Sequence, residues 1–397
     1  MTAELSVAIP LTSTAAQRAR GATLAIFFIQ GAVFATWVSR IAVVQERLGL
    51  SNSRLGLALL AISLAGMVAM PVTGRVVARV GSRAAVRVAV MLYCLMLLLP
   101  GVAGNYAELW AGLFGLGAMF GVMNVAINSQ AVVVERAYGR PIMAGFHALF
   151  SLGGMAGAAV GGLMAARGVP VLMHFAMAAG VLGTVGAVAA PMMLAEPARE
   201  GTHEEHGSGW RAFLHPRLLM LGVVAFCVLV GEGAMADWTA VYLHRGLGTG
   251  LGFAAAGYAA FSLAMTGGRL VADRVTAAIG PVHFVRYGAA LAAVGLAVGL
   301  ASHVPMVALL GFACAGAGFS GICPILFSAG GRTKGVAPSE GIAAVATMGF
   351  VGFLIGPPVI GVVADWTSLT WGLGVVVLAS GVAAGLAGRV GEGGNSE

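Results

Sequence analysis

The chain has 397 residues, of which 59% are hydrophobic and 9% are charged, and its mean hydropathy is +0.94. Soluble domains carry about 25% charged residues, so this composition excludes an ordinary water-soluble protein. A net charge of +7 is compatible with nucleic acid as a partner. However, the sequence lacks the combination of aromatic and basic residues typical of a nucleic-acid surface, so we expect no nucleic-acid ligand.

Twelve segments are long and apolar enough to cross a bilayer, which takes about 20 residues per helix. None of them shows the period-two alternation of barrel strands. The sequence therefore predicts an all-α polytopic membrane protein with 12 transmembrane helices in two six-helix halves. Residues 1–195 form the N-terminal bundle, 196–216 a cytoplasmic linker and 217–397 the C-terminal bundle. The predicted spans are 21–40, 55–74, 84–104, 107–132, 142–165 and 169–193, then 217–243, 252–271, 284–301, 305–328, 341–364 and 367–388.

The basic residues are unevenly placed relative to these spans. Of the 22 lysines and arginines, 17 fall on the side of the two termini and the linker, and 5 fall on the other side. Cytoplasmic loops of membrane proteins carry such an excess of positive charge. We therefore expect a multi-pass protein of the bacterial inner membrane with both termini in the cytoplasm.

An internal repeat supports the division into halves. Gln30-Gly-Ala-Val-Phe-Ala-Thr-Trp37 returns about 200 positions later as Glu232-Gly-Ala-Met-Ala-Asp-Trp238, and further glycines recur at a similar offset, Gly117 pairing with Gly318. Parallel halves of this kind are typical of one large class of transporters, in which the substrate site lies between the halves near mid-membrane. The repeat therefore predicts a secondary transporter.

Two carboxylates inside the seventh span are the candidates for proton coupling. A charged side chain at mid-membrane costs at least about 2.5–3.5 kcal/mol, and protonation removes most of that cost. Glu232 and Asp237 lie five residues and about 140° apart on a helix, so we expect them on different faces and favour Glu232. The alternative is a structural hydrogen bond or ion pair. Gln30 occupies the matching place in the first half without the charge.

Other polar and aromatic side chains lie on faces that an alternating-access site uses. Such side chains bind polar solutes, but they also join helices together. Arg40 either holds an anionic group, pairs with Asp237, or reaches the outer interface from its helix. Glu135 and Arg269 end polar stripes that run toward the cytoplasm. The substrate-binding candidates are Gln30, Trp37, Asn124, Asn128, His147 and Tyr258.

The loop after the second span carries a recognisable motif. Gly74-Arg-Val-Val-Ala78-Arg79-Val-Gly81-Ser-Arg83 resembles the loop signature of the major facilitator superfamily, with Ala78 at the acidic position, and Gly268-Arg269-Leu-Val-Ala-Asp273-Arg274 is a second copy. The resemblance implies an inner gate at this loop. With the residues above, the expected gating set is Arg40, Arg75, Arg79, Glu135, Arg269 and Asp273.

Two further stretches narrow the resemblance. The stretch from Asn124 to Ser151 is similar to a poorly characterised bacterial inner-membrane subgroup that has Asp where Asn124 stands, which moves the expected coupling site to Glu232. The glycine run from Gly153 to Gly162 partly resembles the antiporter signature of drug exporters, with Ala158 in place of the expected proline.

The function expected from these features is proton-coupled transport of a small polar organic solute by alternating access. A proton-driven multidrug exporter, an uncoupled facilitator and a membrane sensor on a transporter fold are the alternatives. No set of nucleophile, base and orienting residue indicates an enzyme, and we expect no cofactor or metal. The expected partners are the solute, protons and the lipid bilayer, with the protein as a monomer.

Overall fold

The computed structural model of the chain describes residues 14–139, 142–195 and 214–391. In this part of the chain, eleven helices have the length and hydropathy to cross a membrane. They correspond to all the predicted spans except 252–271. The helix at that place, α12 (Ala256–Ile279), is long enough to span but carries Arg269, Asp273 and Arg274 in its second half, so its mean hydropathy is lower. The predicted linker lies mostly outside the described residues.

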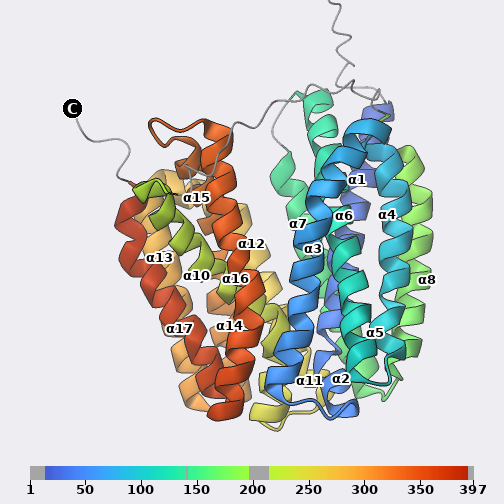
Figure 1. The fold of residues 1–397 in the computed structure, drawn as a ribbon, viewed down its shortest axis with the longest axis vertical. Coiled ribbons are helices and arrows are strands. Elements are labelled where there is room, and N and C mark those ends of the chain that lie inside the picture. Colours follow the sequence, from blue (N-terminus) through green and yellow to red (C-terminus); the bar gives the residue numbers. More distant parts are fainter. Residues whose placement is uncertain (1–13, 140–141, 196–213, 392–397) are drawn as a thin grey trace, which may run out of the picture.

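The helices form two bundles that stand side by side (Figure 1). The N-terminal bundle contains α1 (Thr14–Val38), α2 (Ile41–Arg47), α3 (Asn52–Val80), α4 (Ser82–Met96), α5 (Leu98–Val102), α6 (Tyr106–Tyr138), α7 (Met143–Ala166), α8 (Val171–Ala189) and the 3-10 turn η1 (Ala190–Met192). The C-terminal bundle contains α10 (Pro216–Val241), the π-helical turn η2 (Tyr242–Gly246), α11 (Leu251–Ala254), α12, α13 (Pro281–Ser302), α14 (Pro305–Phe319), α15 (Ile322–Gly331), α16 (Pro338–Trp366), α17 (Leu369–Leu386) and the 3-10 turn η3 (Ala387–Val390).

Two predicted spans are each broken into two helices by a proline. A proline ring clashes with the carbonyl four residues earlier and supplies no N–H to it. Pro100 stands four residues after Met96, where α4 ends, and Pro324 stands four residues after Ser320, between α14 and α15. Other helices extend past their apolar runs, because charged residues such as Glu135 continue the helix beyond the hydrocarbon.

Matching backbone contacts relate the two bundles. A Cβ atom added to Gly153 of α7 would lie 2.1 Å from the Phe28 carbonyl oxygen of α1, and one added to Gly352 of α16 would lie 2.5 Å from that of Phe226 on α10. Only glycine permits helices to approach this closely. A third pair corrects the predicted alignment. Gly117 packs on the carbonyl of Ile62 in the first half, and Gly316 packs on the carbonyl of Phe261 in the second half. Gly117 therefore aligns with Gly316 and not, as predicted, with Gly318.

Candidate functional site

A hydrogen bond joins the bundles deep between the helix ends. The Arg269 guanidinium of α12 donates from Nη1 to Ser151 Oγ of α7 over 3.0 Å. Arg269 is 13 residues from the start of α12 and 10 from its end, which places it about 20 Å and 15 Å from those ends at 1.5 Å per residue. Ser151 is buried and Arg269 is half-buried. A positive charge is therefore held between the two halves.

Several ionisable groups surround this guanidinium. Arg269 interacts electrostatically with Glu232 of α10, His147 of α7 and Cys323 of α15. Glu232 is partly accessible, and no ion pair within 4.0 Å joins it to Arg269 in the described part of the chain. The carboxylate and the guanidinium thus attract each other without a direct ion pair.

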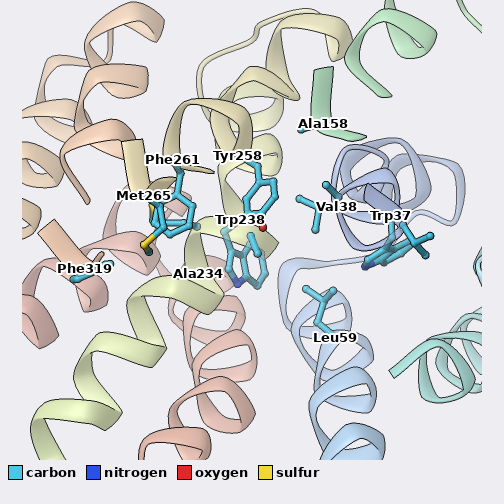
Figure 2. Close-up of a cluster of buried hydrophobic side chains, with 14 of the residues drawn as sticks. Trp37, Val38, Leu59, Ala158, Ala234, Trp238, Tyr258, Phe261, Met265 and Phe319 are labelled. Atoms are coloured by element: carbon cyan, nitrogen blue, oxygen red, sulfur yellow. The ribbon is translucent and has the colours of Figure 1, made fainter. Parts of the chain in front are cut away.

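Tyr258 connects this cluster to the N-terminal bundle. Its hydroxyl pairs with Ser262 one turn along α12 and interacts electrostatically with Arg269. Its ring centroid lies 6.2 Å from that of Phe34 on α1, in an edge contact. Figure 2 shows Tyr258 between Trp238 of α10 and Val38 of α1. Tyr258 is 6% exposed, so the two halves meet around it in this conformation.

Asp237 also interacts electrostatically with Tyr258, as Glu232 does. Both carboxylates are partly accessible. The 140° between them on the helix therefore does not assign them to separate surroundings, because both interact electrostatically with Tyr258. Which of the two exchanges protons stays a prediction.

Two of the predicted substrate ligands are closed off in this conformation. Gln30 is 1% exposed and Trp37 is 0% exposed, and Val38 lies between Trp37 and Tyr258 in Figure 2. Within the described residues, Gln30 Nε2 and Trp37 Nε1 have no hydrogen-bond partner. A solute reaches either group only after the helices rearrange.

Three other predicted ligands keep accessible surface, whereas Tyr258 is buried. Asn124 and Asn128 are partly accessible and bond to each other, Asn128 Nδ2 donating to the Asn124 backbone oxygen over 2.8 Å and to its Oδ1 over 3.0 Å. The His147 ring stands 5.2 Å from that of Phe27, edge to face. Substrate contact at these three residues remains a prediction.

Arg40 does not make the contacts expected of it. It is 1% exposed, its Nη2 donates to the Val169 carbonyl, and its Nε contacts His174 Nδ1 at 3.3 Å. Both partners belong to the N-terminal bundle, so Arg40 neither pairs with Asp237 nor reaches the outer interface here. The reason is that the connection between α7 and α8 turns back over Arg40 and offers it a free carbonyl.

The remaining gating candidates divide into two groups. Glu135 Oε2 accepts from the backbone N–H groups of Ile142 and Met143, 2.8 Å each, so it holds the start of α7. Exposed residues at the end of the molecule opposite α2 and α11 make up the second group, and their gating role stays a prediction. They are Arg75, Arg79 and Asp273.

A further set of contacts between the bundles lies toward the end that carries α2 and α11, which we call the α2–α11 end. Asp365 of α16 accepts from the backbone N–H groups of Asn52 and Ser53 at the start of α3, over 2.9 Å and 2.8 Å. A Cβ on Gly361 would lie 2.4 Å from the Asn52 carbonyl oxygen. The sequence did not predict a role for Asp365, because nothing in it indicates which helix end this side chain meets.

Close backbone contacts continue along this end. A Cβ on Gly56 of α3 would lie 2.5 Å from the Pro357 carbonyl oxygen of α16, and one on Gly162 of α7 would lie 2.8 Å from that of Gly252 in α11. Further in, Ser63 Oγ donates to the Phe353 carbonyl over 3.1 Å. The bundles are thus held together from the α2–α11 end to the middle of α3.

Comparisons with known proteins agree with this architecture. The sequence profile of the Major Facilitator Superfamily matches residues 22–335. An uncharacterised MFS-type transporter of Yersinia pestis is 36% identical over 89% of this chain and 90% of its own length. The membrane protein MosC of Rhizobium meliloti is 32% identical over 90% of this chain and 86% of its own.

Solved structures share the fold at low sequence identity. A point mutant of the nucleoside transporter NupG superposes with a TM-score of 0.74 at 13% identity, covering 95% of this chain and all of that one. A bacterial homologue of the human lysosomal transporter Spinster, in an inward-facing and occupied conformation, gives 0.70 at 13% identity over 94% and 96% of the two chains. These transporters have the twelve-helix architecture that the sequence predicts.

Proposed function

Because the chain belongs to the Major Facilitator Superfamily, we propose that it is a secondary active transporter that moves a small polar organic solute by alternating access and couples this to proton movement. The observation that carries the proposal is Glu232, a partly accessible carboxylate inside α10 that interacts electrostatically with Arg269 where the halves meet. A carboxylate at this depth is expensive in its charged form. Binding and release of a proton at Glu232 therefore changes the charge seen by a solute between the bundles.

The arrangement of contacts supports alternating access. The bundles are joined at the α2–α11 end by backbone approaches and by Asp365. Transport requires these contacts to break while new ones form at the opposite end, so that each end opens in turn. The distribution of basic residues supports a place in the inner membrane with the termini in the cytoplasm. With that orientation, the α2–α11 end faces the periplasm and is the closed end here.

Flux measurements in proteoliposomes test the proposal. Purified protein is reconstituted with a pH-sensitive dye inside, and sugars, organic acids and cationic dyes are supplied outside as separate gradients. We expect one of these classes to enter and to move protons with it in the wild-type protein. Glu232→Gln keeps the size and hydrogen bonding of the side chain, so this variant separates proton coupling from folding.

The outcomes distinguish the candidate functions. Entry of a solute without proton movement, equal in wild type and Glu232→Gln, contradicts coupling and leaves a facilitator. Proton-driven efflux of cationic dyes that survives substitution of Asn124 and Asn128 identifies a drug exporter instead. The nucleoside specificity of NupG is that protein's own, since 13% identity supports the fold and no shared ligand.

A further inference from the structure

The guanidinium of Arg269 lies between the bundles without an ion-pair partner among the described residues. We propose that Arg269 binds the carboxylate of the transported solute, which is a small organic monocarboxylate. This inference rests on the proposed function and specifies its substrate class. It assigns a substrate ligand that the sequence placed among the gating residues.

The hydrogen bonding of Arg269 leaves room for a ligand. A guanidinium has five N–H donors in a planar fork that matches a carboxylate, and in the described part of the chain Arg269 makes one hydrogen bond, to Ser151. Among the described residues, the remaining nitrogen atoms of Arg269 have no partner but are not fully buried. These donors therefore keep accessible surface, as binding of a solute requires.

The charges around Arg269 favour a monoanion. Arg269 is half-buried, and removing a charge from water is costly without a counter-charge. No carboxylate of the described residues pairs with Arg269 within 4.0 Å. A carboxylate from the solute supplies that charge. A phosphate dianion fits less well, because a single guanidinium faces it and neutralises only one of its two charges.

Further hydrogen-bonding groups surround the place where the carboxylate binds. Ser262 and Tyr258 precede Arg269 by 7 and 11 residues on α12, which is about two and three helical turns, so the three residues lie on one helix face. His147 of α7 also interacts electrostatically with Arg269. Hydroxyl and imidazole groups at this site suit a solute that carries hydroxyls beside its carboxylate.

The same geometry gives a physical basis for coupling. The ionised Glu232 and a solute carboxylate are both attracted to Arg269, so they compete for it. A proton on Glu232 removes one competitor and leaves the guanidinium to the solute. One proton and one monoanion then cross together, and the pair carries no net charge.

Binding to charged and uncharged twins of one solute tests the proposal. The probes are lactate with lactamide and gluconate with glucose, added at up to millimolar concentrations to the detergent-purified full chain, with thermal stability and isothermal calorimetry as readouts. The variants are Arg269→Gln and Arg269→Lys, and the control is Arg274→Gln, which removes an exposed arginine from the same helix. Unliganded stability of each variant shows that it folds.

We expect a carboxylate to stabilise the wild type and its uncharged twin to bind at least tenfold more weakly. A hydrogen bond to a charged group contributes about 1.5–3 kcal/mol, so Arg269→Gln should bind the carboxylate about 10- to 150-fold more weakly. Arg269→Lys should retain part of the affinity, and Arg274→Gln should bind as the wild type does.

Four outcomes overturn the proposal, and a fifth overturns only the coupling. It fails if no carboxylate in the panel binds, if an uncharged twin binds as well as its acid, or if Arg269→Gln leaves the affinity unchanged. Proton-driven, Glu232-dependent flux of an uncharged solute would overturn this inference and keep the proposed function. Carboxylate binding that needs Arg269 but moves no protons would keep the inference and overturn the coupling.

Discussion

Gly361 of α16 offers a direct way to unbalance the two access states of the proposed transport cycle. Its replacement by alanine places a methyl group 2.4 Å from the Asn52 carbonyl oxygen of α3, whereas ordinary contact begins at 3.4 Å. The bundles must therefore separate by about 1 Å at this point. Because the contact joins the two halves, the clash is confined to the conformation in which the α2–α11 end is closed.

The size of the effect follows from the cost of overpacking. Extra methyl groups in tightly packed sites cost about 1–3 kcal/mol, which corresponds to a shift of about 5- to 150-fold in the equilibrium between closed and open forms. Gly153→Ala is the matched control. Its methyl group would lie 2.1 Å from the Phe28 carbonyl oxygen, but both residues belong to the N-terminal bundle, so it lowers stability in both conformations.

The assay is pulsed electron paramagnetic resonance, which measures the distance between two spin labels at the α2–α11 end. Val102 at the end of α5 and Val304 between α13 and α14 are exposed, one in each bundle, and cysteines there in a background without native cysteines accept the labels. Gly361→Ala should enlarge the population with long separations, and Gly153→Ala should not. An unchanged distance distribution in folded Gly361→Ala, or an equal change in both variants, would refute the reasoning.

Two further predictions use the same materials. Asp365→Asn removes the negative charge at the start of α3, which costs about 0.3–1 kcal/mol for an exposed group, so spin labels should show a shift of up to about fivefold toward the open form. This shift should shrink at high salt, and an effect that salt leaves intact would point to another cause. Arg40→Lys keeps the charge but loses the fork to Val169 and His174, so thermal unfolding should show a loss of about 1–3 kcal/mol without a change in the label distances. An unchanged midpoint would mean that Arg40 does not hold this connection.

The fold could be predicted well from the sequence because each membrane span is a continuous run of residues along the chain. A helix in lipid needs a run of about 20 apolar residues, and such runs can be counted. The exceptions are instructive. The breaks at Pro100 and Pro324 follow from a local rule and were available to sequence reasoning. The repeat was also found, although its alignment at Gly117 was two residues out because glycines are dense there.

The candidate site was predicted in part, and the failures share a cause. Glu232 and Tyr258 were selected because a polar group in an apolar helix is unusual wherever it points, and the structure brings both near Arg269. Arg40 was misjudged because its partners depend on a connection 129 residues away. Asp365 was missed for the same reason, since its partners lie 312 and 313 residues away. Pairings at such distances along the chain are set by tertiary packing, within the N-terminal bundle for Arg40 and between the bundles for Asp365.

Proton movement through Glu232 is the central claim, and one measurement addresses it most directly. Proteoliposomes that contain a pH-sensitive dye receive a solute gradient, with wild type and Glu232→Gln compared at matched protein incorporation. The account predicts that solute entry acidifies the interior in the wild type and that Glu232→Gln abolishes the acidification. Solute entry with the same acidification in both proteins would show that protons take another route, and entry without acidification in the wild type would show that transport is not proton-coupled.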